Sequence, residues 1–107
     1  MTAEEMKEIA HAAAKRKAEQ REARITLLAK EWFEYHLPKI NAELRTEAEL
    51  GHFAIIYQIK SPHNYECLSE IVSLIKKEFE PLGFQVTVSN QGDYSSVYID
   101  CRDKSGN

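Results

Sequence analysis

The stretch LSEIVSLIKKEFEPLGFQVTVS, residues 68–89, contains a helix pattern followed directly by a strand pattern. Its large apolar residues recur first at the three-to-four-residue spacing of a helix face and then at the two-residue spacing of a strand face: Leu68, Ile71, Val72, Ile75 and Phe79, then Phe84, Val86 and Val88. Pro81 and Gly83 lie between the two patterns and should end the helix. We therefore predict a helix over residues 65–80 and a strand beginning near Phe84.

Two further strand patterns flank this unit. FAIIYQI, residues 53–59, is apolar on both faces and rich in aromatic and β-branched residues, which is typical of a strand covered on both sides. SVYID, residues 96–100, alternates with Val97 and Ile99 on one face, with Cys101 continuing that face, and NQGDY supplies the turn before it. The predicted fold is α+β, a long N-terminal helix followed by a β-α-β-β unit with a small three-stranded mixed sheet.

The sequence before residue 53 predicts helix over most of its length. Thr2 and Glu5 fit a capping box, so the helix should start there. Residues 3–24 consist mostly of strong helix formers, and Met6 and Ile9 are their only large apolar side chains. This segment has too little apolar surface to pack on a core, so we expect a solvated arm unless a partner covers its small alanine face.

From Ile25 onward the helix gains a wide apolar face, made of two neighbouring stripes. They comprise Ile25, Leu28, Trp32 and His36, and beside them Ala29, Phe33, Leu37, Ile40 and Leu44. Pro38 predicts either a kink or a break that opens a new helix, and Gly51 predicts the helix end. One helix across a small sheet leaves the second sheet face open, and this apolar helix or another copy of the chain is the material available to cover it.

The predicted organisation has three parts. Residues 1–24 form a charged helical arm, residues 25–101 an α+β domain, and residues 102–107 a flexible C-terminal tail. The net charge of −3 argues against a surface that is basic overall, and no apolar run reaches the roughly 18 residues that span a bilayer. The N-terminus is acidic where a secretory signal is basic, so we expect a cytoplasmic protein that does not contact membranes.

Motifs for catalysis, cofactors and metals are absent from the sequence. Gly83 and Gly92 are isolated turn glycines, the four histidines lack metal-ligand spacing, and two distant cysteines do not make a disulfide framework. We therefore expect no enzyme activity, no cofactor and no metal. His63 and Cys67 could form a nucleophilic pair at a helix start, but a half-buried cysteine beside a loop histidine is the favoured interpretation.

Basic and aromatic residues of the N-terminal helix are the candidate binding residues. Five cations within residues 15–24 outnumber two glutamates and could follow a phosphate backbone, although interspersed charge on a helix more often gives solubility: Lys15, Arg16, Lys17, Arg21 and Arg24. Trp32 and Tyr35 lie in the aromatic stretch LLAKEWFEYHLPKI. Trp32 should either pack in the core of one chain or anchor a second subunit, and the core role is favoured.

The helix-to-strand passage KKEFEPLGFQVTV, with the hairpin after it, resembles small proteins of uncharacterised function that are common in tailed-bacteriophage genomes. The resemblance covers residues 25–101 and implies a viral accessory or virion-associated protein without enzymatic activity, and it assigns no functional residue. Together with the residue patterns it predicts a non-enzymatic homo-oligomer that binds another protein of the host or phage. The alternative is a nucleic-acid-binding accessory protein that uses the basic arm.

Overall fold

The computed structural model describes residues 1–60, 67–90 and 94–102, and it confirms the α+β class. Along the chain lie the long helix α1 (Ala3–Glu49), strand β1 (Ala54–Ile59), helix α3 (Leu68–Phe79), the short 3₁₀ helix η1 (Glu80–Leu82), strand β2 (Gln85–Asn90) and strand β3 (Ser95–Asp100). Four predicted segments fall wholly or partly outside the described residues. They are the loop after β1, the start of the helix 65–80, most of the turn before β3 and most of the C-terminal tail.

Both ends of α1 follow the sequence signals. At its start the hydroxyl oxygen of Thr2 accepts a hydrogen bond from the backbone N–H of Glu5 at 3.1 Å, as expected for an N-cap. At its end Gly51 has a φ of 85°, and its N–H donates to the carbonyl of Ala48 at 3.0 Å. The next N–H, of His52, reaches back to the carbonyl of Glu47 at 2.9 Å, which completes a Schellman motif.

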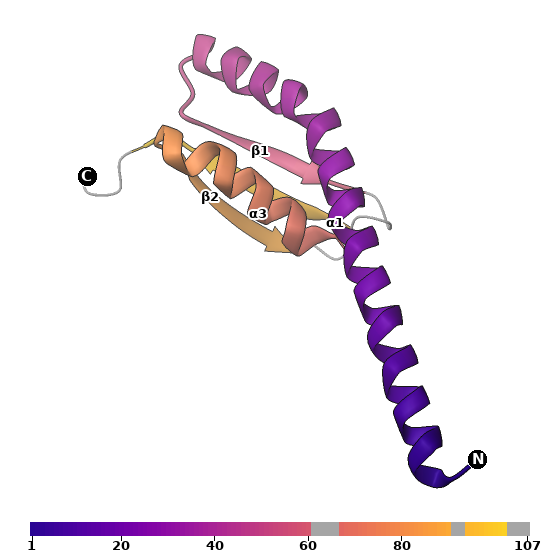
Figure 1. Ribbon diagram of the computed structural model, residues 1–107. Helices are drawn as coiled ribbons and strands as arrows, with labels where there is room; N and C mark the ends of the chain where they lie inside the picture. Colours follow the sequence, from indigo (N-terminus) through magenta and orange to yellow (C-terminus); the bar gives the residue numbers. More distant parts are fainter. Residues whose placement is uncertain (61–66, 91–93, 103–107) are drawn as a thin grey trace.

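Pro38 lies inside α1 and does not break it. A proline in a helix removes one backbone hydrogen bond and pushes the preceding turn away, so it bends the axis. The ribbon of α1 indeed changes direction part-way along its length (Figure 1). Of the two outcomes predicted for Pro38, a bent helix is the one found, and buried residues on both sides of it, Ala29 and Ile40, hold the helix against the core.

The sheet has the strand order β1-β3-β2, and both neighbouring pairs are antiparallel. This differs from the predicted mixed sheet. β1 and β2 do run in the same direction, as the α3 connection between them requires, but β3 inserts between them and pairs with both. Ile99 of β3 accordingly faces Ile55 of β1 on one side and Val86 of β2 on the other.

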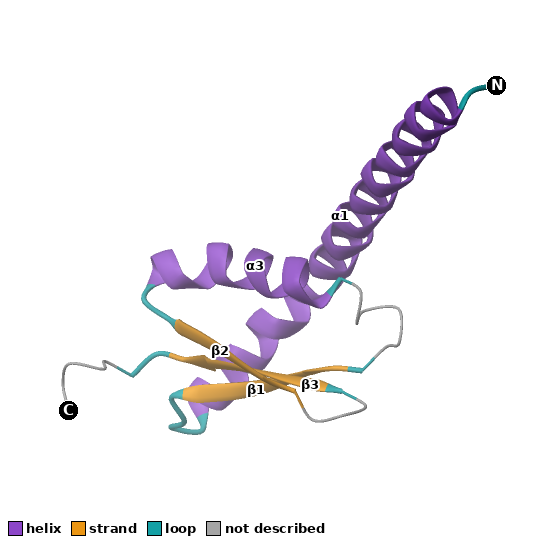
Figure 2. Ribbon diagram, turned by 90° about the horizontal axis from the view of Figure 1, so that it is seen from below, coloured by secondary structure: helices purple, strands orange, loops and turns teal. Residues whose placement is uncertain are grey.

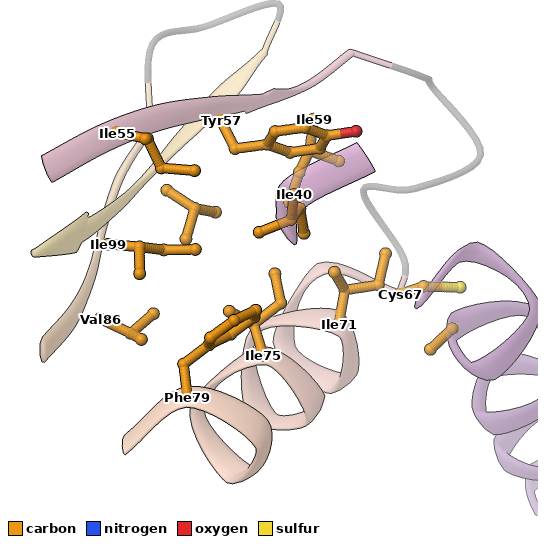
Figure 3. Close-up of a cluster of buried hydrophobic side chains, with 12 residues drawn as sticks. Ile40, Ile55, Tyr57, Ile59, Cys67, Ile71, Ile75, Phe79, Val86 and Ile99 are labelled. Carbon is orange, nitrogen blue, oxygen red and sulfur yellow. The ribbon is translucent and has the colours of Figure 1, made fainter. Parts of the chain in front are cut away.

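One face of this sheet carries the core. Ile40 of α1 lies between Tyr57 of β1 and Ile71 of α3 (Figure 3) and is completely buried. α1 also contacts α3 directly, and α3 lies along one side of the sheet (Figure 2). The buried cluster draws on α1, α3 and all three strands: Ala29, Ile40, Ile55, Tyr57, Ile59, Cys67, Ile71, Ile75, Phe79, Val86, Val97 and Ile99.

Of the two coverings that the sequence left open for the second sheet face, α1 does not provide one. Residues of that face alternate with the core residues along each strand, and among them Ile56 is 56% exposed and Thr87 is also exposed. The strand prediction for residues 53–59 is right, but its burial on both faces is wrong. The apolar face of α1 instead packs against α3 and the core side of the sheet.

The N-terminal half of α1 projects away from this packed head (Figure 1). Residues 3–24 are exposed except for the partly covered Ala13, and packing on the core begins at Ile25. The molecule measures 70 × 28 × 24 Å and has a radius of gyration of 19.3 Å. A compact chain of this length would have a radius near 13 Å, so the projecting helix dominates the shape. Within the described residues, no helix combines the length and the apolar character needed to cross a membrane.

Candidate interaction surfaces

The predicted basic residues all lie on the exposed arm, but they do not form one surface. Lys17, Arg21 and Arg24 line a shallow depression together with Gln20 and Ile25, as residues about one helical turn apart should. Lys15 and Arg16 are not part of it, because successive residues of a helix point about 100° apart. None of the five cations forms an ion pair within 4.0 Å with any residue that the structure describes.

The arm also presents apolar side chains to solvent. Met6 is 64% exposed and Ile9 is 58% exposed, and the small residue Ala13 follows them on the same side of the helix. Ala18 lies on the opposite side from Ile9, since nine residues make two and a half turns. Met6 and Ile9, here called the arm patch, therefore face away from Ala18 and touch no part of the head.

The two predicted aromatic binding residues have different surroundings. Trp32 is half-buried, and its ring stacks on His36 with the ring centres 4.0 Å apart. It also meets the edge of Tyr57 of β1 at 6.1 Å, so it packs within one chain, as the favoured core role requires. Tyr35 is 64% exposed, and the ammonium of Lys39 donates to its hydroxyl at 3.1 Å while lying over its ring.

His36 and Tyr57 form a polar contact that was not predicted from the sequence. Nδ1 of His36 and the hydroxyl oxygen of Tyr57 lie 2.5 Å apart in a half-buried position between α1 and β1. Burial lowers the pKa of His36, and the nearby cation of Lys39 lowers it further. Burial also raises the pKa of Tyr57, with smaller contributions from Glu43 and Tyr35. A neutral His36 that accepts the Tyr57 proton in a hydrogen bond fits both directions.

This pair could have been found by combining two sequence patterns. His36 continues the Ile25, Leu28 and Trp32 stripe of the helix, and Tyr57 occupies an inward position between Ile55 and Ile59. Each pattern marks one polar aromatic residue on a core-facing surface. Because buried polar groups are usually hydrogen-bonded, two of them on facing elements are candidates for a mutual bond.

Stability should fall as the solution becomes acidic, in part because of His36. The lowered pKa of folded His36 means that the unfolded chain binds the proton more readily, so protonation favours unfolding as pH drops through 6.5 and below. We expect the free energy of unfolding to decrease from pH 7.5 to pH 5, and His36→Phe, which cannot take up a proton, to have a shallower decrease. Urea unfolding at several pH values measures this. His11→Gln in the exposed arm is the control, and equal pH slopes for wild type and His36→Phe would contradict the expectation.

The positions of the cysteines and of the possible metal ligands give no support to a nucleophilic or metal site among the described residues. Cys67 is buried at the start of α3 and Cys101 is exposed, so no disulfide joins them. Cys67 is only 1% exposed and not half-buried as its position in the sequence suggested, so the thiol of the hypothetical nucleophilic pair is not presented to solvent. Its suggested partner His63 lies outside the described residues. Within residues 1–60, 67–90 and 94–102, no three His, Cys, Asp or Glu side chains gather as they would around a metal ion.

Comparison with protein-family models, with curated proteins and with solved structures finds no match to this chain.

Proposed function

We propose that this chain is a non-enzymatic interaction protein that self-associates and binds another protein, with the α1 arm as the main contact between copies. The observation that carries the proposal is the contrast within α1. From Ile25 onward the helix is held by the core, whereas residues 3–24 extend from the same helix without tertiary contacts to the head. Helices in proteins owe most of their stability to packing, so an unpacked extension of this length is best stabilised by a partner.

The arm patch supports a protein partner in particular. Met6 and Ile9 expose large apolar surfaces next to small alanines, and small residues allow a second helix to approach closely. Burying two such side chains between copies would contribute about 1.5–3 kcal/mol each. The symmetry of a pair of identical arms would let each patch cover the other.

A viral accessory or virion-associated setting is part of the same proposal and rests on the resemblance of residues 25–101 alone. We place the protein in the cytoplasm, which is that of the host cell if the protein is viral.

Charged residues in the arm patch should weaken the self-association. In the variant Met6→Glu with Ile9→Glu, two carboxylates would have to lose their water in the contact, so the dissociation constant should rise at least tenfold. Ala18→Glu, on the opposite side of the same helix, should have little effect. Light scattering coupled to size-exclusion chromatography measures the mass of each variant and of a chain lacking residues 1–22. An unchanged number of chains per particle after both the substitutions and the deletion would reject the arm as the contact.

A second candidate function is nucleic-acid binding through the cations of the arm. What favours it is the grouping of Lys17, Arg21 and Arg24 on one side of the exposed helix without ion-pair partners among the described residues. Binding to a duplex should then weaken steeply with salt, and Lys17→Glu, Arg21→Glu and Arg24→Glu together should weaken it more than Lys15→Glu with Arg16→Glu. A gel shift without any complex at low salt would remove this candidate.

A further inference from the structure

The side of α1 that faces away from the head carries exposed apolar side chains beyond the arm patch. Ile9 is 58% exposed and Leu27 is 57% exposed. A separation of eighteen residues makes five full turns, so these two side chains point in the same direction. Ala29 and Ile40, which pack on the core, lie on the opposite side of the helix. The stripe that contains Ile9 and Leu27 is therefore not covered by the head.

The residues along this stripe form a pattern that is symmetric about its centre. Six side chains point within about 40° of one direction between the two ends of the stripe. In chain order they are Ile9, Ala13, Arg16, Gln20, Ala23 and Leu27. The outermost two are large and apolar, the next two are alanines, and the central two are long and polar. A second copy of the stripe that runs in the opposite direction would place each residue opposite its counterpart.

We propose that a second copy of α1 lies antiparallel along this stripe, across a two-fold axis at the level of Ala18. Ile9 would then contact Leu27 of the partner subunit, and the guanidinium of Arg16 would donate to the side-chain oxygen of the partner's Gln20. The alanines between them would let the helices approach closely. This contact rests on the proposed self-association and deepens it by setting the direction of the arms. If the two arm patches met each other instead, both Leu27 side chains would stay exposed.

One flank of the stripe carries charges that complement each other in this direction. Glu5, Glu19 and Lys30 lie on this flank, and Arg16 lies at its edge. A two-fold axis perpendicular to both helices brings the same flank of each helix to the same side of the contact. There Glu5 is level with the partner's Lys30, and Arg16 is level with the partner's Glu19. Because each pair occurs twice, four opposite-charge pairs flank the contact.

The other acidic residues near Lys30 are compatible with this arrangement. Lys30 lies 4.0 Å from Glu34 of its own chain, but the two side chains are 68% and 65% exposed, so the lysine can reach the partner's Glu5 as well. Glu34 itself is level with the partner's Thr2. The partner's Glu5 is also level with Glu31, but it lies across the stripe from Glu31, on the flank of Lys30.

The second flank carries Lys17, Arg24 and Glu31. Arg24 is level with the partner's Ala13 and Glu31 with the partner's Met6, so neither is level with a like charge on this flank. Lys17 is near its own copy at the axis. It points about 80° from the stripe, so its ammonium group can extend into solvent.

A parallel pair in register is less favourable. Glu19 could reach the partner's Arg24 in such a pair, but Arg16 would lie on the contact opposite the partner's Arg16. Two like charges that lose water in a contact oppose association. The antiparallel pair instead places Arg16 beside the partner's Gln20 and Glu19, so the charges select this direction.

Disulfide trapping tests the direction of the arms in the full-length chain. Ile9→Cys and Leu27→Cys are prepared as separate proteins, both with Cys101→Ser, because Cys101 is exposed whereas Cys67 is buried. In the antiparallel pair positions 9 and 27 are adjacent, while the two copies of position 9 lie about 27 Å apart along the helices. Mild oxidation should therefore give a covalent dimer in the mixture of the two proteins and little in either protein alone.

The outcomes separate this proposal from the proposed function. A covalent dimer of Ile9→Cys alone that is as abundant as the dimer in the mixture would show that the arms meet in another arrangement. It would overturn the antiparallel contact while self-association through the arm stands. A mixture without covalent dimer would also overturn it. If deletion of residues 1–22 leaves the number of chains per particle unchanged, the arm contact of the proposed function itself fails.

A charge exchange provides an independent test. Glu5→Lys should raise the dissociation constant about threefold to tenfold, because it places like charges together twice in each dimer, and adding Lys30→Glu should restore association. Glu4→Lys is the matched control, since Glu4 lies in the same first turn but points about 140° from the stripe. Sedimentation velocity measures association, and circular dichroism verifies folding. Equal effects of Glu5→Lys and Glu4→Lys, or a double variant no better than Glu5→Lys alone, would overturn the proposal.

Discussion

Phe79→Ala is expected to lower the free energy of unfolding by about 3–5 kcal/mol, the usual range for truncating a large buried aromatic residue. Phe79 is 1% exposed at the end of α3, and its ring meets the edge of Phe84 with the ring centres 5.7 Å apart. It therefore connects α3 to the chain segment that enters β2. Small domains have only about 5–15 kcal/mol in total, so this single cavity would remove a large share of the stability.

Urea unfolding followed by far-ultraviolet circular dichroism measures the effect of Phe79→Ala. Leu82→Ala is the matched control, because Leu82 follows three residues later and is 66% exposed. Surface truncations of this kind usually change stability by less than about 0.5 kcal/mol. A loss below about 1 kcal/mol for Phe79→Ala would contradict the placement of this ring in the core.

Trp32→Ala is expected to lower the free energy of unfolding by about 2–4 kcal/mol, somewhat below the range for a fully buried ring. Trp32 is half-buried, stacks on His36 and contacts the edge of Tyr57, so its removal opens the junction between α1 and β1. Because these contacts lie within one chain, the loss should not depend on protein concentration. An aromatic anchor between subunits would instead give a loss that varies with concentration.

Thermal unfolding of Trp32→Ala at several protein concentrations separates the two roles. Tyr35→Ala is the control, since Tyr35 lies three residues further along α1, is an exposed aromatic and should contribute little to stability. A shift in melting temperature that grows on dilution would assign Trp32 to a contact between copies. Tryptophan fluorescence like that of the free amino acid in water would contradict the packing of the ring altogether.

The sequence predicts well those features that depend on local chemistry and periodicity. Thr2 caps the helix as its hydroxyl and position require, and Gly51 and Gly83 take positive φ angles of 85° and 99° where helical segments end. The apolar stripes that begin at Ile25 are the residues that reach the core, including the fully buried Ile40. These signals lie within a few residues of one another, so neighbouring residues suffice to interpret them.

Features that depend on pairing between distant segments could not be predicted from neighbouring residues. Periodicity in FAIIYQI and SVYID does not say which strands are neighbours, so the insertion of β3 between β1 and β2 was missed. For the same reason the sequence left open whether α1 or another copy of the chain covers the second sheet face. The His36 and Tyr57 contact joins residues 21 positions apart, and a groove between α3 and Val88 of β2 exists only once α3 lies over the sheet edge.

Self-association can be measured directly from the mass of the unmodified chain in solution. Sedimentation equilibrium over protein concentrations from about 1 to about 100 μM, the range in which contacts of moderate affinity form, gives this mass without a variant or a known partner. With a monomer of 12.3 kDa, we expect a mass of two or more chains that rises with concentration. A constant mass of one chain across the whole range would contradict it.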